Sequence, residues 1–169
     1  EFVTGSSIQK KPDYIEDIFR LAVKTNLNRG LKSMQQVARD IDNAKIGQII
    51  YPLMQIVDVK KLGVNFVVSG LEQRKIYMLG LDEGKEIDMQ DAVYLYTPLI
   101  PSLKGEGKMS SSIEESFVSI RDSKEDIIRK INKAYCKQGD VVNNPILAVT
   151  RYILFPKFEK IKIKRKKEY

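Results

Sequence analysis

The sequence predicts an α/β fold with parallel strands, followed by the start of an α-helical domain. Two short, largely apolar runs, residues 64–68 and 93–96, are predicted to be strands. The residues between them have a helical pattern, and strands that alternate with helices favour a parallel sheet. From about residue 121 onward only helical patterns follow, so we divide the chain into domains 1–120 and 121–169.

Two helical stretches are predicted before the first strand. Residues 12–40 repeat apolar side chains at helical spacing, open on Pro12 and break near residues 25–28. Residues 44–61 form a second helix that contains Pro52, which interrupts the backbone hydrogen-bond ladder. Most side chains of this helix are apolar, so we expect it and the strand that follows it to be buried.

The remaining elements follow the first strand. Ser123 precedes acidic residues and Asn144 precedes a proline, and both patterns are typical of helix starts. In chain order we expect a helix from near Leu71, a loop over residues 98–112, a short strand over 117–120, a basic amphipathic helix over 124–135, and a last helix to about Leu154.

The chain carries an excess of positive charge, with 29 Lys and Arg residues against 22 Asp and Glu residues and a formal net charge of +7. This excess favours an anionic partner. The basic residues become denser towards the end of the chain, where they either follow phosphates or form a solvated face. They are Lys157, Lys160, Lys162, Lys164, Arg165, Lys166 and Lys167.

Cysteine and histidine usage excludes several kinds of site. The single cysteine, Cys136, excludes an internal disulfide and fits a cytoplasmic protein in reducing surroundings. The chain contains no histidine, which excludes a Cys–His nucleophile and disfavours a zinc site. We therefore interpret Cys136 as a packing residue, and we assign no metal-ligating residue. No apolar run approaches the length of a membrane span.

A polar stripe lies on the helix around Pro52. Tyr51, Gln55 and Asp58 are spaced at i, i+4 and i+7, which places them on one helix face. Polar groups on a buried helix are costly unless they find partners. A ligand with a hydroxyl and an ammonium group would supply those partners. A satisfied internal network, or an exposed polar face, would explain the stripe as well.

A second polar segment begins where the first strand is predicted to end. Ligands of parallel sheets bind beyond the carboxyl ends of the strands, where helix N-termini attract anions and carboxylates. Gly70 allows a ligand to approach closely, and Gln73 would point at it. Arg74 and Lys75 add positive charge. An ordinary turn before a charged first helical turn is the alternative interpretation.

The third segment is a loop rich in glycine and serine. Gly105 and Gly107 give mobility, and Lys108 supplies a positive charge. Three serine hydroxyls with successive backbone N–H groups can bind phosphate oxygens and stabilise a pyrophosphate leaving group. A flexible loop in which Ser112 and Glu115 form a helix-capping box is the alternative.

The three segments together resemble the motifs of archaeal and eukaryotic tyrosyl-tRNA synthetases, which are class I aminoacyl-tRNA synthetases. Residues 108–112 read KMSSS, a form of the class I KMSKS signature. Residues 51–58 read YPLMQIVD, similar to the family's YPxMQxxD helix, and residues 70–75 read GLEQRK, similar to its G(M/V)(E/D)QRK segment. The similarity extends from about Arg20 to Pro156, and the order and spacing of the motifs make it specific.

This resemblance implies a fold, a reaction and partners. The fold is the C-terminal half of a Rossmann-like nucleotide-binding domain, followed by the start of the helical anticodon-binding domain. The reaction activates L-tyrosine with ATP to tyrosyl-adenylate and transfers the tyrosyl group to tRNA(Tyr), with Mg2+ expected to accompany ATP. The family works as a homodimer, and residues 12–40 belong to the region that carries the dimer contact.

The resemblance also implies roles for individual residues. Tyr51, Gln55 and Gln73 help to hold the amino group and backbone end of tyrosine. Asp58 accepts a hydrogen bond from the substrate phenol.

The phosphate and tRNA sites are implied in the same way. Basic positions that approach the acceptor end of the tRNA are matched by Lys32, Arg74 and Lys75. Residues that bind the ATP phosphates are matched by Lys108, Met109, Ser110, Ser111 and Ser112, of which Lys108 and Ser111 are the catalytic residues.

The chain also departs from the family pattern. Class I synthetases carry a HIGH-like motif whose histidines stabilise the α-phosphate, whereas this chain has no histidine. Ser111 stands where the general signature has a second lysine. We therefore expect an internal or C-terminal-half fragment that is inactive alone. Two other functions compete: a non-catalytic tRNA- or RNA-binding module, which the positive charge favours, and the related tryptophanyl enzyme, against which Asp58 argues.

Overall fold

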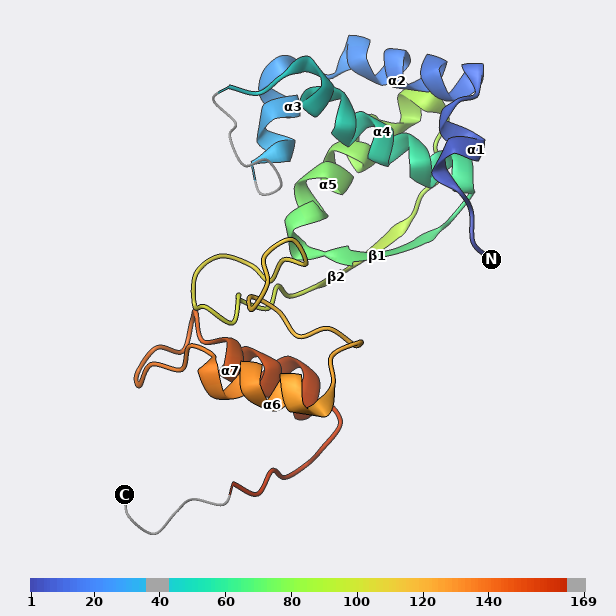
Figure 1. Cartoon of the computed structure of the whole chain (residues 1–169). Coiled ribbons are helices and arrows are strands. Elements are labelled where there is room, and N and C mark those ends of the chain that lie inside the picture. The colour runs from blue at the N-terminus through green and yellow to red at the C-terminus, as the bar shows by residue number, and fades with distance from the viewer. Residues whose placement is uncertain (36–42, 164–169) are drawn as a thin grey trace. The chain divides into compact units, whose positions relative to one another are not determined.

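The computed structural model of the chain describes residues 1–35 and 43–163. It divides into two compact units, Glu1–Thr97 and Pro98–Tyr169, which we call unit 1 and unit 2 (Figure 1). These units are defined by which residues pack together, and the boundary between them lies before the predicted domain boundary at residue 120. The functional domains 1–120 and 121–169 stay a prediction. None of the described helices is long and apolar enough to cross a membrane.

The helices of unit 1 follow the predicted pattern. The break near residues 25–28 is confirmed, because the chain turns at Thr25 and the Asn26 side chain accepts a hydrogen bond of 3.0 Å from the Arg29 N–H at the next helix start. Pro52 lies inside one continuous helix. Residues 36–40 of the predicted stretch lie outside the described residues. The helices are α1 (Gly5–Gln9), α2 (Pro12–Lys24), α3 (Leu27–Met34), α4 (Ile46–Leu62) and α5 (Arg74–Glu83).

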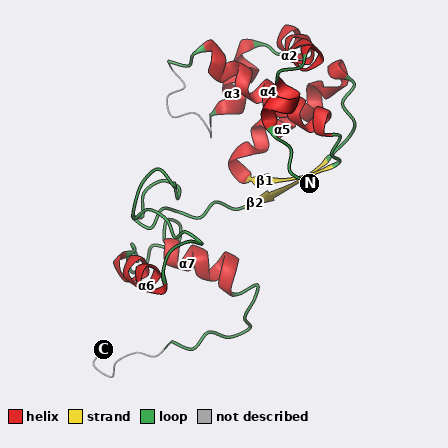
Figure 2. Ribbon diagram, turned by 45° about the vertical axis from the view of Figure 1, so that its right-hand side comes forward, coloured by secondary structure: helices red, strands yellow, loops and turns green. Residues whose placement is uncertain are grey.

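A two-stranded sheet confirms the predicted parallel pairing. Strand β1 (Phe66–Gly70) pairs with β2 (Val93–Thr97) in parallel, with Phe66 opposite Val93 and Gly70 opposite Thr97. The helices of unit 1 gather on one side of this sheet (Figures 1 and 2). On that side Tyr77 of α5 stacks on Tyr94 of β2, with 4.8 Å between ring centroids.

The expectation that the first strand is buried is wrong. Phe66 and Val68 are 55% and 58% exposed, and Val93 and Leu95 beside them are 64% and 52% exposed. Strand side chains alternate between the two faces of a sheet, and the helices of unit 1 cover only the face that carries Tyr94. Within unit 1 the other face of the sheet is therefore open and apolar. We call Phe66, Val68, Val93 and Leu95 the open sheet face.

The core of unit 1 lies between α2, α4 and α5. Its buried side chains are Tyr14, Ile18, Leu21, Leu53, Ile56, Val57, Ile76, Leu79 and Ile87. The predicted burial of the helix around Pro52 is thus confirmed for its core-facing side. A second apolar row on α2, formed by Ile15, Phe19 and Val23 at i, i+4 and i+8, stays exposed.

A buried carboxylate joins α2 to α4. Asp17, 3% exposed, accepts hydrogen bonds of 2.8 and 3.0 Å from the Lys60 ammonium and lies 2.9 Å from the Lys61 ammonium. Burial by itself raises the pKa of Asp17, but the bonds from Lys60 and Lys61 outweigh it and hold the pKa below its ordinary value. The ionised form of Asp17 is therefore the one that stabilises the fold.

Asp17→Asn is expected to lower the free energy of unfolding of the chain by about 2–3 kcal/mol, because it leaves two partly buried ammonium groups without their common partner. Asp88→Asn removes a carboxylate whose side chain is 81% exposed, so its effect should stay below about 1 kcal/mol. Urea titrations at neutral pH compare the two variants, and equal effects would contradict the assignment. Because the folded pKa of Asp17 is lowered, its contribution is present above the ordinary carboxyl pKa of 3.8 and disappears as the pH falls below it.

Unit 2 contains α6 (Lys124–Lys133) and α7 (Pro145–Val149), which continues into a π-helical turn, Thr150–Leu154. Both predicted helix starts are confirmed. The Ser123 hydroxyl accepts a bond from the Asp126 N–H, and the Asn144 side chain accepts bonds from the N–H groups of the first turn of α7. Residues 98–112 form the predicted loop.

Two predictions for unit 2 are wrong. Residues 117–120 form no strand, because the described chain offers them no partner strand; the Ser119 N–H donates instead to the Asp122 carboxylate at 2.8 Å. Cys136 is exposed rather than packed, and its sulfur accepts a hydrogen bond from the Asn144 amide at 3.5 Å. In the basic tail, Lys157, Lys160 and Lys162 are exposed, and residues 164–167 lie outside the described residues.

Candidate functional site

The polar stripe of α4 changes in character along the helix. Tyr51 is half exposed, whereas Gln55 and Asp58 are partly buried. The three side chains leave the same helix face, as their spacing predicts. Asp58 has hydrogen-bond partners, whereas the Gln55 side-chain oxygen has none among the described residues, so the three side chains do not form one network.

Asp58 has internal partners. Its carboxylate accepts hydrogen bonds from the Tyr14 hydroxyl at 2.8 Å and from the Gln9 amide at 3.2 Å. Tyr14 is fully buried, and burial, followed by the bond to Asp58, raises its pKa, so that its hydroxyl keeps the proton it donates. A carboxylate has lone pairs for further donors, so these two bonds leave Asp58 able to accept another.

Sequence reasoning missed Gln9 and Tyr14 as neighbours of Asp58. Tyr14 is 44 residues away and fits the apolar repeat of α2, so no local pattern shows that its hydroxyl faces α4. The internal-network interpretation of the stripe therefore holds for Asp58.

Two glutamines carry buried acceptors without partners. Among the described residues, the side-chain carbonyl oxygens of Gln55 and Gln73 find no hydrogen-bond donor. The Tyr96 hydroxyl and one Glu72 oxygen are in the same condition. Each unsatisfied buried group costs on the order of 1–3 kcal/mol. A ligand group that donates several hydrogen bonds, such as an ammonium group, would satisfy acceptors of this kind.

Gln73 occupies the place that the sequence predicts. It ends the short 3-10 turn Leu71–Gln73, which follows the carboxyl end of β1 and leads directly into α5. Tyr96 lies near the carboxyl end of the neighbouring strand, opposite Ser69. The Gln73 carbonyl and the Tyr96 hydroxyl thus belong to residues at the edge of the sheet where parallel α/β sheets bind ligands.

The three basic residues Lys32, Arg74 and Lys75 lie together. They line one cavity of about 330 Å³ between α3 and α5. The Lys75 ammonium donates to the Gln35 side chain at 2.7 Å, and Arg29, on the same cavity wall, pairs with carboxylates of α5. The cavity is therefore positively charged on the side that carries α3 and the start of α5.

The loop of unit 2 is closed at its base by backbone hydrogen bonds. The Leu103 N–H donates to the Ser116 carbonyl at 2.9 Å, and Pro101 forms an antiparallel bridge with Lys108. Gly105 and Gly107 have φ angles of +82° and +69°, which glycine adopts readily. Lys108 is exposed, and no carboxylate of the described residues pairs with it.

The serines of the loop form a turn. The Ile113 N–H donates to the Ser110 carbonyl at 3.1 Å, so Ser111 and Ser112 are the central residues of a turn over residues 110–113. The hydroxyls of Ser110 and Ser112 lie 2.8 Å apart. No helix begins at Ser112, so the helix-capping alternative is wrong. The described residues contain no cluster of His, Cys, Asp or Glu that could hold a metal ion.

The chain matches the family of tRNA synthetases class I (W and Y) over residues 1–169. It is 42% identical to a tyrosine–tRNA ligase of Methanosarcina barkeri over 168 residues, which are 99% of this chain and 52% of the relative. The crystal structure of a tyrosyl-tRNA synthetase complexed with L-tyrosine from Archaeoglobus fulgidus aligns with 98% of this chain and 51% of its own, at 42% identity and a TM-score of 0.83.

Two further solved structures also resemble the chain. A tyrosyl-tRNA synthetase from Aeropyrum pernix aligns with 92% of this chain and 46% of its own, at 36% identity and a TM-score of 0.79. A tryptophanyl-tRNA synthetase from Encephalitozoon cuniculi aligns with 88% of this chain and 42% of its own, at 20% identity and a TM-score of 0.60, which shows a shared fold. The chain thus spans about half the length of the relatives it matches.

Proposed function

We propose, from the premise that this chain belongs to the tRNA synthetases class I (W and Y), that it works as part of a tyrosine–tRNA ligase. The observation that carries the proposal is the pair of buried, unpartnered carbonyl oxygens on Gln55 and Gln73. Buried acceptors without partners suit the ammonium group of an amino acid, and Gln73 lies at the carboxyl edge of the parallel sheet, where such ligands bind.

Tyrosine is the substrate that fits the remaining polar groups. Gln55 and Gln73 accept hydrogen bonds from its ammonium group, and the half-exposed Tyr51 helps to hold the same end. Asp58 accepts a bond from the phenol through a lone pair that Tyr14 and Gln9 leave available. The identity of 42% to proteins named for tyrosine supports this choice over tryptophan.

ATP is proposed to bind the loop of unit 2. Lys108 supplies a mobile positive charge, and Ser110, Ser111 and Ser112 supply hydroxyls and N–H groups that suit phosphate oxygens. Met109 lies between them in the same loop. Lys108 and Ser111 stabilise charge as pyrophosphate leaves. Mg2+ is expected to arrive bound to the ATP phosphates, because Mg2+ in nucleotide sites is held largely by substrate phosphates and water.

tRNA(Tyr) is the proposed macromolecular partner. Lys32, Arg74 and Lys75 line one cavity of about 330 Å³, and a phosphate-rich acceptor end would meet three cations there. A cytoplasmic location follows from this role, because the tRNA and ATP pools used in translation are cytoplasmic.

The fold proposed is the C-terminal half of a Rossmann-like domain, followed by the start of a helical anticodon-binding domain. The open sheet face supports it, since parallel sheets normally have both faces covered and two strands alone are marginal. The relatives are about twice as long as the matched region, so their other half is long enough to supply that cover.

The test is tyrosine-dependent ATP–pyrophosphate exchange by what we call the joined synthetase. In this protein the chain replaces the matched region of the Archaeoglobus fulgidus relative. We expect exchange with tyrosine, none with tryptophan, and none from the chain alone. Salt-sensitive RNA binding without tyrosine-dependent exchange would instead favour a non-catalytic RNA-binding module, and exchange with tryptophan would favour the other branch of the family.

A homodimer is proposed to form through the exposed row of α2, Ile15, Phe19 and Val23. An exposed apolar row marks an interaction surface, and it lies within residues 12–40, the region that the family resemblance assigns to the dimer contact. Phe19→Glu is expected to weaken self-association at least tenfold, because it places a charge in the apolar contact. Sedimentation equilibrium of the joined synthetase measures this. Lys24→Glu, at the exposed end of the same helix, is the control, and equal association of both variants would exclude this surface.

A further inference from the structure

We propose that Ser116 is a positioning residue that forms the turn over residues 110–113 before any phosphate binds, and that the Glu115–Arg129 ion pair fixes Ser116 to α6. None of these three residues belongs to the five-residue signature, residues 108–112. The inference rests on the proposed function, because that function makes residues 108–112 the phosphate-binding loop.

Ser116 lies at the centre of the loop's hydrogen bonds. It is 1% exposed, and its hydroxyl lies 2.9 Å from the Ser110 carbonyl and 2.6 Å from the Ile113 carbonyl. The same oxygen accepts a weak bond from the Ser110 N–H at 3.4 Å. The single hydroxyl proton can serve either carbonyl, so one buried side chain holds both ends of the turn.

Two consecutive turns carry this arrangement. The Ile113 N–H donates to the Ser110 carbonyl at 3.1 Å, and the Ser116 N–H donates to the Ile113 carbonyl at 3.2 Å. Glu115 is a central residue of the second turn and has a φ angle of +64°. Side chains other than glycine rarely adopt this conformation, and it persists only where the surroundings determine it.

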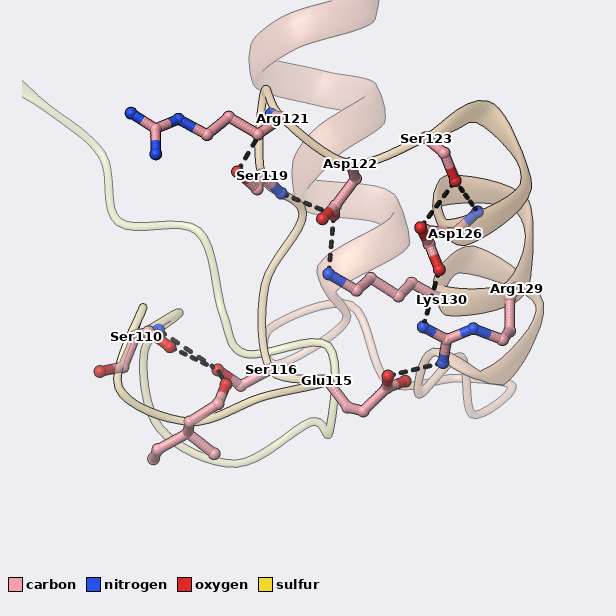
Figure 3. A network of polar contacts seen from close by, with 11 residues as sticks. Ser110, Glu115, Ser116, Ser119, Arg121, Asp122, Ser123, Asp126, Arg129 and Lys130 are labelled. Carbon is pink, nitrogen blue, oxygen red and sulfur yellow. Dashed lines mark hydrogen bonds and ion pairs between the residues drawn. The ribbon is translucent and has the colours of Figure 1, made fainter.

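An ion pair holds Glu115 in this backbone conformation. The Glu115 carboxylate lies 2.5 Å from the Arg129 guanidinium, which also lies 3.2 Å from Asp126 in the first turn of α6 (Figure 3). The bond from Arg129 lowers the pKa of Glu115, so the pair stays charged at neutral pH. The second turn is therefore tied to a helix.

A second pair secures the following segment. The Lys130 ammonium, on a side chain that is 7% exposed, lies 2.7 Å from the Asp122 carboxylate (Figure 3). It also lies 5.0 Å from the centre of the Phe117 ring. Residues 115–122 are thus held to α6 at two points, one on either side of Ser119.

The lysine end of the loop is held differently. Lys108 follows Gly107 and stays exposed, and Gly105, which has a φ angle of +82°, allows the Tyr135 ring to pack against its backbone. The two ends of the loop therefore have different roles in phosphate binding. The serines are fixed in place, and Lys108 moves towards a phosphate when one arrives. Fixed donors bind with less loss of entropy than donors that must first be ordered.

The test uses the chain itself, with inorganic pyrophosphate as the probe. Amide hydrogen exchange at residues 110–113 is measured by NMR, and pyrophosphate affinity is measured by calorimetry. Ser116→Ala is expected to speed exchange at Ser110 and Ile113 and to weaken pyrophosphate binding, each about tenfold, because it removes the buried hydroxyl that lies between the Ser110 and Ile113 carbonyls and accepts from the Ser110 N–H. Lys108→Ala should weaken pyrophosphate binding without changing exchange at those two amides.

Arg129→Gln keeps the proposal testable if Ser116→Ala fails to fold, because the Arg129 side chain is 42% exposed. It should speed exchange at Ser116 and weaken pyrophosphate binding about threefold, in line with the loss of a surface ion pair. Lys124→Gln, which removes a cation from the exposed start of α6, is the matched control and should change neither.

The outcomes separate this inference from the proposed function. Unchanged exchange and affinity in Ser116→Ala would overturn the inference, and so would a wild-type chain that binds no pyrophosphate at all. The proposed function fails on a different result, namely a joined synthetase without tyrosine-dependent exchange.

Discussion

Lys108→Ala in the joined synthetase is expected to slow tyrosine-dependent ATP–pyrophosphate exchange by about 100- to 1,000-fold, the usual cost of removing one group that stabilises charge in a transition state. Tyrosine binding should stay close to the wild-type value. The effect should appear mainly in kcat, because the lysine is needed most when charge builds on the leaving pyrophosphate.

The reason lies in the isolation of Lys108 within the loop. It is exposed, and none of the described carboxylates neutralises it. The signature position that carries a second lysine in the general class is Ser111 here, so this loop has one signature cation in place of two. Removal of Lys108 would therefore leave the signature without a cation.

Lys104→Ala is the matched control. Lys104 is an exposed lysine in the same loop, before both glycines, and its removal should change exchange less than twofold. Equal exchange rates in Lys108→Ala and wild type would exclude the proposed role of the loop. A parallel loss of tyrosine affinity would show instead that the substitution disturbs the fold.

Local signals in the sequence predicted local structure well. Ser123 and Asn144 cap the helices that follow them, and the break before α3 lies where the apolar repeat is interrupted. Each of these features depends on residues within one helical turn, where side-chain and backbone groups meet whatever the rest of the chain does. The parallel pairing of β1 and β2 also followed, from the helix between them.

Features that depend on distant residues were not predicted. The hydrogen bond between Tyr14 and Asp58 joins residues 44 positions apart, and the role of Ser116 depends on carbonyls of a turn that no pattern specifies. The apolar residues Phe117 and Val118 suggested a strand, but a strand exists only where another strand pairs with it. The open sheet face shows the same limit, since an apolar pattern indicates that a residue can be buried and does not identify what covers it.

The sequence predicted where several residues of the candidate site lie, but it did not predict the hydrogen bonds that Asp58 makes. Gln73 lies beyond the carboxyl end of β1, and Lys32, Arg74 and Lys75 share one cavity. Asp58, however, already has two donors, so an incoming phenylalanine would not leave its carboxylate without partners. Under the proposed function, Asp58 would then discriminate between tyrosine and phenylalanine through one added hydrogen bond to a charged group.

Asp58→Asn in the joined synthetase is therefore expected to reduce the preference for tyrosine over phenylalanine by about 10- to 100-fold, since a hydrogen bond to a charged group contributes about 1.5–3 kcal/mol. The measured quantity is the ratio of kcat/KM for the two amino acids in the exchange reaction. Asp88→Asn, which removes an exposed carboxylate from the same unit, should leave the ratio unchanged.

Tyr14→Phe shows how much of the effect of Asp58→Asn comes from losing the hydrogen bond between Tyr14 and Asp58 and how much from losing the proposed bond to the substrate. It removes the 2.8 Å bond to Asp58 but keeps the carboxylate charged, so the proposed acceptor for the phenol of tyrosine remains. We expect a smaller loss of preference than in Asp58→Asn, accompanied by a lower melting temperature, because the Tyr14 ring is fully buried and its hydroxyl also lies 3.0 Å from the Met54 carbonyl. A preference that survives Asp58→Asn unchanged would mean that the carboxylate serves the packing of α2 on α4 alone, and that tyrosine is selected by other residues.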